Sequence, residues 1–190
     1  MTKEIYFSID MEADGPCPGL NSMLSLGAVA MSEQSGVLGE FYMNLQLLPE
    51  AQPHALTQAN FWDKFPHMYE ITRQDPQPPE VVMDAFRSWI RSWGGTPVAV
   101  AFPAGFDFSW LWYYLNRFGG DCPFSHSCID MKTLAWCVMG GNYRHATKRR
   151  WPSHWFHPTI KHNHHALQDA QEQGHTFRAM LQDLRRMHNT

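Results

Sequence analysis

Three strand-like segments follow one another in the first quarter of the chain, and this succession limits the possible folds more than any other feature. Residues 5–12 are rich in β-branched and aromatic side chains and precede the turn-forming residues 14–16. Residues 24–31 and 38–47 have a similar strand-like character, with the polar, glycine-containing residues 32–36 between them. Short connections join antiparallel neighbours, so we expect a three-stranded antiparallel meander.

After the meander, segments with helical apolar spacing alternate with a short strand. The spacing predicts helices over residues 80–93, 106–118, 129–139 and 165–187. The apolar run 97–102 fits a buried strand. This order predicts an α/β fold in which a mixed β-sheet, the meander plus parallel strands, is flanked by α-helices. We expect residues 1–190 to form a single domain, because a chain of this length can bury one substantial core.

Charge and cysteine content narrow the classes of partner. The formal net charge of −3 argues against a protein that coats duplex nucleic acid, although a small nucleic-acid substrate stays open. Basic residues gather between 144 and 161, within a segment (140–163) that lacks periodicity and that we predict to be a long surface loop. Four cysteines without a paired framework indicate a reducing, cytoplasmic setting, and no apolar run is long enough to span a membrane.

Two acidic residues end the first predicted strand. Asp10 and Glu12 are two positions apart, and side chains alternate along a strand, so both carboxylates face the same side. Two carboxylates directly after the apolar residues 5–9 are costly to bury unless cations or hydrogen bonds compensate. The pair is a candidate metal site, although an Asp-x-Glu sequence also arises by chance at the polar end of a strand.

Further candidates are Asp107, His164 and Asp169. Asp107 follows the predicted strand 97–102 and opens a helix, where α/β sheets tend to place functional groups, but an aspartate there also serves as a helix cap. His164 and Asp169 differ by five positions, about 140° around a helix, so they would not share a helical face. We therefore place His164 on the loop before the last helix and Asp169 on the second turn of that helix, facing the sheet.

The order of these elements resembles a known family. Asp-x-Glu on the first strand, Phe-Asp after a middle strand and His-x-Ala-Leu-x-Asp-Ala at the last helix are similar to the three motifs of the DEDDh 3′-5′ exonucleases, whose fold is ribonuclease-H-like. The likeness extends from Tyr6 to about Phe177 and includes residues 25–29. It implies hydrolysis of phosphodiester bonds from a single-stranded 3′ end.

The resemblance also implies a role for each matching residue. The carboxylate ligands of two divalent cations, Mg²⁺ or Mn²⁺, would be Asp10, Glu12, Asp107 and Asp169. Such oxygen ligands suit Mg²⁺, and without cations the carboxylates would repel one another. His164, rather than His165, would be the general base, since a neutral imidazole with a pKa of about 6.5 accepts a proton near neutral pH. Residues 101–105 lack the asparagine that many members have here, which bears on substrate contacts more than on the metal site.

Two segments are candidates for contacts with the terminal nucleotide. Small residues let a backbone approach a base closely, so we expect the loop residues Ala13, Asp14 and Gly15 to contact it. Phe61 and Trp62 follow an irregular segment, and we expect their rings to stack on bases, although most aromatic side chains of the chain must belong to the core.

Alternative interpretations stay open at the level of sequence. A catalytically silent ribonuclease-H-like module that binds nucleic acid is disfavoured because all five catalytic positions are filled. A zinc site built from Cys122, His126 and Cys128, or from histidines between 154 and 165, matches no standard structural spacing. RNA or short oligonucleotides are favoured over DNA because we expect no second domain that would tether the chain to a duplex. A homodimer is expected only by analogy with relatives.

Overall fold

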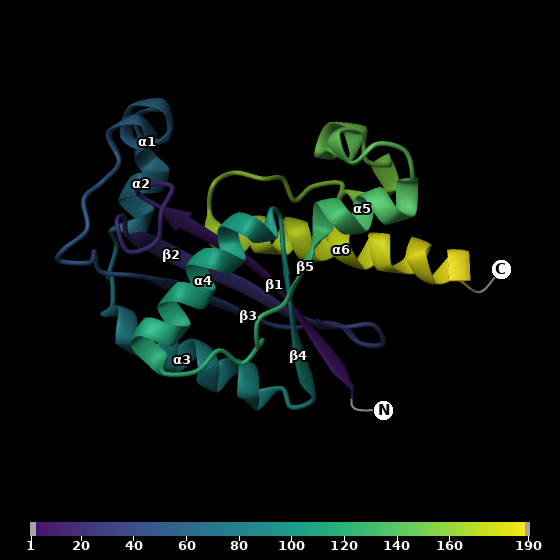
Figure 1. Cartoon of the computed structure of the whole chain (residues 1–190), viewed down its shortest axis with the longest axis horizontal. Coiled ribbons are helices and arrows are strands. Elements are labelled where there is room, and N and C mark those ends of the chain that lie inside the picture. The colour runs from purple at the N-terminus through teal and green to yellow at the C-terminus, as the bar shows by residue number, and fades with distance from the viewer. Residues whose placement is uncertain (1–2, 189–190) are drawn as a thin grey trace.

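One mixed β-sheet of five strands runs through the molecule in the order β3-β2-β1-β4-β5 (Figure 1). The computed structural model describes residues 3–188, and its strands are β1 (Glu4–Ala13), β2 (Met23–Ser32), β3 (Gly36–Asn44), β4 (Thr96–Ala101) and β5 (Cys128–Asp130). β1 to β3 form the predicted antiparallel meander, and β4 and β5 extend the sheet beyond β1 in parallel pairing. The predicted mixed sheet is therefore confirmed.

Helices cover both faces of this sheet (Figure 1). On one side lie α3 (Pro79–Ser92) and α4 (Ala104–Gly119), and on the other lie α5 (Met131–Met139) and α6 (Ala166–His188). Each helix pair buries its own hydrophobic core against the sheet. None of the helices in residues 3–188 has the length and hydrophobicity that a bilayer span requires.

Side-chain alternation along β1 decides which core each residue joins. Phe7 and Ile9 pack in the core beneath α3 and α4, whereas Tyr6 packs in the core beneath α6. Asp10 and Glu12 have the same parity as Tyr6, so they lie on the α6 face near the carboxyl end of the strand. Two acidic side chains of the central strand thus face the last helix of the chain.

Residues 55–72 contain helical structure that the sequence pattern did not indicate. They form α1 (Ala55–Asn60), the 3₁₀ turn η1 (Trp62–Lys64) and α2 (Pro66–Thr72). His54 caps α1 by accepting a hydrogen bond from the Thr57 amide. No residue of α1 is buried, so this helix has no apolar stripe for a periodicity analysis to detect.

The segment between α5 and α6 corrects the prediction of a plain surface loop. It contains three 3₁₀ turns, η2 (Tyr143–His145), η3 (Lys148–Arg150) and η4 (Ser153–Trp155). Ala146, Trp151 and Trp155 are buried in the core beneath α6, so we name residues 143–155 the turn segment. The tryptophans are spaced irregularly, and this explains why the pattern showed no amphipathic period. β5 was also missed, because three residues are too few to show alternation.

Candidate active site

The structure brings the predicted carboxylates together on the α6 face of the sheet. Asp10 and Glu12 come from β1 and Asp169 from the first turn of α6. One carboxylate oxygen from each of these three residues lies within 4.8 Å of those of the other two. The three side chains are 7%, 8% and 0% exposed, respectively, so solvent screens their mutual repulsion only weakly.

Asp107 adds a fourth carboxylate to this group. It lies in the first turn of α4, a helix that begins at Ala104, three residues before the aspartate. Its side chain is buried, and its charge is the largest electrostatic contribution, after burial itself, to the raised pKa of Asp10. Its Oδ2 has no hydrogen-bond partner among the residues that the structure describes. A buried carboxylate oxygen without a donor is suited to a cation or a bound water.

Burial is the main cause of the unusual titration of this cluster. It raises the pKa values of Asp10, Glu12 and Asp107 well above the usual carboxyl range, and repulsion among the acidic groups raises the pKa of Asp10 and Glu12 further. The ammonium group of Lys148 opposes this at Asp10 and Asp107. The positively charged side chain of Lys148 therefore compensates the negative charge of the cluster only in part.

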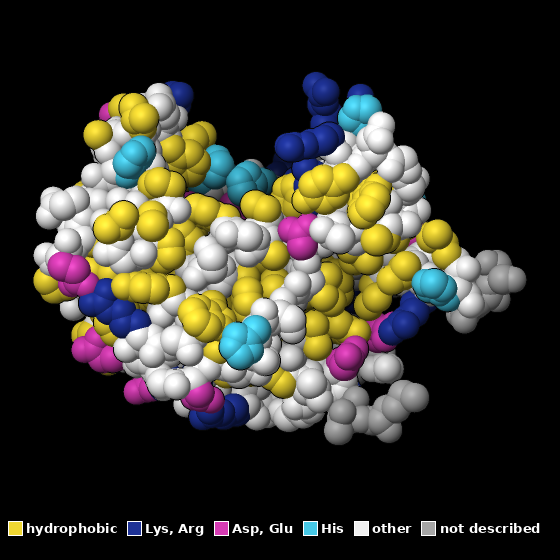
Figure 2. Space-filling model, viewed as in Figure 1, with side chains coloured by type: hydrophobic (Ala, Val, Ile, Leu, Met, Phe, Trp, Pro, Cys, Tyr) yellow, Lys and Arg dark blue, Asp and Glu magenta, His cyan; other side chains and the backbone are white. Residues whose placement is uncertain are grey.

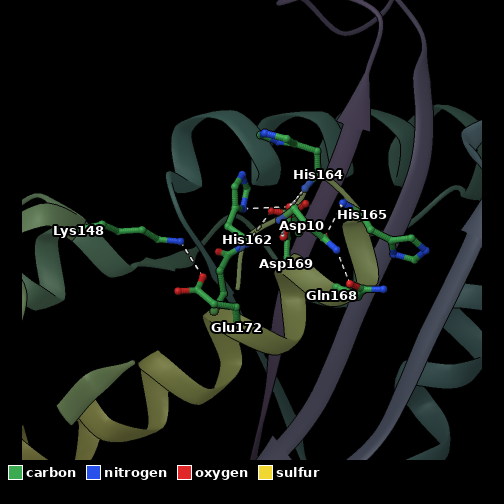
Figure 3. Close-up of polar contacts among 10 residues, drawn as sticks. Asp10, Lys148, His162, His164, His165, Gln168, Asp169 and Glu172 are labelled. Atoms are coloured by element: carbon green, nitrogen blue, oxygen red, sulfur yellow. Dashed lines mark hydrogen bonds and ion pairs between the residues drawn. The ribbon is translucent and has the colours of Figure 1, made fainter. Parts of the chain in front are cut away.

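Backbone geometry before α6 holds the carboxylate of Asp169 (Figure 3). The amide of Asn163 donates to its Oδ1 at 2.8 Å, and the amide of His164 donates to its Oδ2 at 2.9 Å. His164 has a φ of 65°, a left-handed conformation that turns the chain around the carboxylate. As predicted from the five-residue offset, His164 precedes the helix, but Asp169 lies on its first turn and not on the predicted second turn, because the helix begins only at Ala166.

Three histidines lie beside the carboxylates and differ in what they touch (Figure 3). His162 Nδ1 is 2.9 Å from Asp169 Oδ2. A ring nitrogen of His164 lies within 4.8 Å of the same carboxylate, and its ring packs edge-on against Phe61. His165 points away and stacks on Tyr42 at a centroid distance of 4.5 Å. Burial, followed by the neighbouring His162, lowers the pKa of His164, which favours its neutral imidazole.

Sequence analysis missed three residues of this site. His162 contacts Asp169, Gln173 Nε2 donates to Asp10 Oδ1 at 2.7 Å, and Lys148 Nζ donates to Glu172 Oε2 at 2.7 Å. Gln173 follows Asp169 by four positions, so both lie on one face of α6, and that spacing was a usable signal. Lys148 and His162 lie in an aperiodic segment, and the sequence there does not indicate which way a side chain points.

The donor set fits divalent cations that prefer oxygen ligands. Asp10, Glu12, Asp107 and Asp169 offer buried carboxylate oxygens, and no cysteine belongs to a cluster of potential metal ligands within residues 3–188. A second cluster, His162, His164 and Asp169, shares Asp169 with the first. The Cys122, His126 and Cys128 alternative is not among the groupings found in the described residues.

A hollow of about 410 Å³ adjoins the carboxylates. Its lining includes Glu12, Ala13, Gly15, Phe61 and Phe106. Three of these, Ala13, Gly15 and Phe61, are residues predicted to contact the terminal nucleotide. The wall is mostly apolar, as a nucleobase would require.

Two of the predicted substrate contacts have a structural role instead. Trp62 is 1% exposed, and its Nε1 donates to the carbonyl of Ala13 at 3.0 Å, so its ring offers no open face for stacking. Asp14 is buried and accepts a hydrogen bond from the Ser22 amide. Both residues fix the loop that forms the hollow, and the predicted stacking contact remains with Phe61 alone.

Comparison with solved structures establishes the fold family. The chain superposes on the nuclease domain of 3'hExo, a DEDDh family member bound to rAMP, with a TM-score of 0.70 and 11% identity over 95% of this chain and 93% of that one. It superposes on E. coli exonuclease I in complex with a dT13 oligonucleotide with a TM-score of 0.66 and 14% identity, over 98% of this chain and 43% of that one. At such low identities these matches show a shared ribonuclease-H-like fold.

Sequence comparison adds the class of activity. The chain is 32% identical to the 3'-5' DNA exonuclease Cap18 of Escherichia coli over 93% of its own length and 91% of that protein. Fold and site together define a 3′-5′ exonuclease of the DEDDh type. The chain belongs to the family of Rv2179c-like 3'-5' exoribonuclease domains, whose family model matches residues 6–181.

Proposed function

We infer that this chain removes nucleotides from the 3′ end of single-stranded nucleic acid with two divalent cations and His164 as general base. The observation that carries this proposal is the burial of four carboxylates beside a histidine, next to a hollow of about 410 Å³. Asp10, Glu12, Asp107 and Asp169 would hold the cations, Mg²⁺ or Mn²⁺. Bound there, such cations activate a water molecule and neutralise the charge that develops on the leaving oxygen.

The chain's own residues supply proton transfer and positioning. His164 is next to the carboxylates, and its lowered pKa favours the neutral form that can accept a proton from water. Phe61 packs against the His164 ring and lines the hollow, so it orients the imidazole and meets the terminal base at once. Gln173 holds the carboxylate of Asp10 in place.

The substrate we propose is a single strand, with RNA or short oligonucleotides favoured over DNA. The apolar hollow would hold the face of an unpaired base, a surface that a duplex keeps covered. The family is described as exoribonuclease, which supports RNA, whereas the relative Cap18 is described as a DNA exonuclease. Both polymers therefore belong in the assay.

The test is a time course with RNA and DNA oligomers labelled at the 5′ end, single- and double-stranded. We expect a ladder that shortens one nucleotide at a time with Mn²⁺ or Mg²⁺ and no cleavage in EDTA. An internal cut as the first product, or cleavage that persists in EDTA, contradicts the proposal. Faster decay of DNA than of RNA contradicts the substrate preference alone.

Two further expectations stay predictions. The four cysteines are free, consistent with the cytoplasmic location predicted from the sequence. The homodimer expected by analogy is tested by light scattering coupled to size exclusion, where a mass near 22.0 kDa would contradict it.

A further inference from the structure

Three arginines of the turn segment have no side-chain partner within residues 3–188. The side chains of Arg144, Arg149 and Arg150 are exposed and form no ion pair or hydrogen bond with another described residue. Elsewhere in residues 3–188, arginines with carboxylate partners are the rule, as with Arg91 and Asp121 or Arg185 and Glu33. Three guanidinium groups left without counter-charges on one short segment form a surface for an anion.

The backbone that carries these arginines is anchored. Ala146 and Trp151 are buried on either side of η3, and the Trp151 ring packs against Phe102 at a centroid distance of 4.9 Å. Trp155 continues the anchor and donates from its Nε1 to Asp183. The arginines therefore project from a fixed scaffold, which lowers the entropy lost when they bind a ligand.

Lys148 shows how this segment lies relative to the carboxylates. Its ammonium group donates a hydrogen bond to Glu172 of α6, three residues after Asp169, and its charge lowers the pKa of Asp10 and Asp107. Glu12 lines the hollow for the terminal nucleotide. The carboxylates thus lie between the hollow and the turn segment.

The space between these features is a cleft with chemically different walls. Figure 2 shows it between two raised parts of the surface, with histidines at its floor. Lys and Arg side chains gather over η2 and η3, and hydrophobic side chains gather over α1 and α2. Leu56 and Phe65 are exposed on the hydrophobic side. A single strand has the matching pair of surfaces, a charged backbone and flat bases.

On the basis of the exonuclease function proposed above, we propose that Arg144, Arg149 and Arg150 bind the sugar-phosphate backbone of the single strand upstream of its 3′-terminal nucleotide. The strand enters between the arginines and the apolar wall, with its last phosphodiester at the carboxylates and its terminal base in the hollow. The arginines also offset the repulsion between a polyanion and a cluster of acidic residues. This explains how a chain with a net charge of −3 can hold a nucleic-acid strand.

The test compares a long strand with a substrate too short to reach the arginines. Binding of 5′-fluorescein 20-mers of dT and of U is measured by fluorescence anisotropy with Mg²⁺ over a range of NaCl concentrations, on an Asp10→Asn background that keeps the strand intact. The Arg144→Ala/Arg149→Ala/Arg150→Ala variant is compared with its Lys counterpart and with Arg91→Ala, which removes a paired surface arginine. In parallel, the variants with Asp10 restored hydrolyse the p-nitrophenyl ester of thymidine 5′-monophosphate.

The triple Ala variant is expected to raise Kd for the 20-mers at least 10-fold. Loss of three phosphate contacts lowers the slope of log Kd against log [NaCl] by about 2. The Lys variant retains the slope, Arg91→Ala changes neither quantity, and kcat/KM for the ester stays within 2-fold in all variants.

Three results separate the possible failures. An unchanged Kd and slope in the triple Ala variant overturn the assignment of the arginines. A loss of ester hydrolysis equal to the loss of 20-mer binding overturns it too, since the arginines would then act on the reacting nucleotide. Wild-type protein that cleaves neither substrate refutes the exonuclease function, whereas the anisotropy data still decide the arginine contacts.

Discussion

At the scale of single residues, the buried carboxylates carry more charge than the protein itself compensates. Asp10 accepts one hydrogen bond from Gln173, and Asp169 accepts from two backbone amides. Asp107 Oδ2 has no donor among residues 3–188. In the absence of cations, the cluster therefore lowers the stability of the fold, as is common at functional sites.

Replacement of Asp10 by Asn separates the effect of this carboxylate on activity from its effect on stability. We expect kcat to fall by three or more orders of magnitude, about 4 kcal/mol of transition-state stabilisation, because a carboxylate that would hold the cations is lost. The metal-free variant should unfold at a higher temperature than metal-free wild type, since one buried charge is removed and the Asn oxygen can still accept from Gln173. Assays with Mn²⁺ and thermal unfolding in EDTA test this, and a lower melting temperature in EDTA contradicts it.

The two histidines nearest Asp169 are distinguished by separate substitutions. His164→Ala should lower kcat by about 10²- to 10⁴-fold with little change in KM, as expected for loss of a general base. His162→Ala should change kcat by less than about 10-fold, because the Asp169 carboxylate that His162 contacts keeps its two backbone donors. His126→Ala, on an exposed residue, is the control. The reverse ranking would assign the base to His162.

Local geometry placed part of the site from the sequence, whereas Asp107, Asp169 and the role of each residue were predicted from the resemblance to the exonuclease motifs. Alternation along β1 placed Asp10 and Glu12 together, and the five-residue offset placed His164 before α6. His162 and Lys148 could not be predicted, because their contacts depend on the path of an aperiodic segment. Trp62 was misjudged, since an aromatic residue after an irregular segment gives no sign of whether its ring is buried.

At the scale of elements, the close approach of α6 to β2 positions Asp169. A Cβ on Gly27 would lie 2.2 Å from the carbonyl carbon of Ala166, the first residue of α6. This helix therefore needs a glycine at that point of the strand. The finding gives a physical reason for one residue in the 25–29 stretch that resembled the exonuclease family.

Gly27→Ala should accordingly displace the start of α6. We expect a loss of at least about 1–3 kcal/mol in the free energy of unfolding, typical of overpacking, and a drop in kcat of at least 10-fold as Asp169 moves. Urea denaturation and nuclease assays measure both. Gly105→Ala in α4 is the matched control: a Cβ there meets nothing within 4 Å, so stability should rise by about 0.5–1 kcal/mol. Equal stability of the two variants contradicts the argument.

Helices were predicted correctly where the burial of one face gives the sequence a helical period of apolar residues. The helices α3 and α6 bury one apolar stripe each, and their sequences show it. α1 buries nothing, β5 is three residues long, and the turn segment is held by isolated tryptophans. In these places tertiary contacts determine the structure, and no local pattern reports them.

At the scale of the whole molecule, stability should depend on cations and pH together. The folded metal-free protein holds protons on Asp10, Glu12 and Asp107 at pH values where the unfolded chain, with carboxyl pKa values of about 4, has released them. The folded state binds more protons, so its stability falls as pH rises through this range. Divalent cations bind the ionised carboxylates and should reverse this trend.

Thermal unfolding between pH 5 and pH 8 tests the coupling. In EDTA the melting temperature should fall relative to that measured with Mn²⁺ as pH rises, and the difference should shrink in Asp10→Asn. A difference between the two conditions that is independent of pH would show that the cation binds elsewhere.

The position of Asp169 in the first turn of α6 has a practical consequence for trapping a complex. Its carboxylate accepts the amides of Asn163 and His164, so an alanine there would release the chain ahead of the helix as well as remove a ligand. Within residues 3–188, the carboxylate of Asp10 accepts a hydrogen bond from Gln173 and from no backbone amide. An inactive protein intended for co-crystallisation with an oligonucleotide is therefore better made at Asp10.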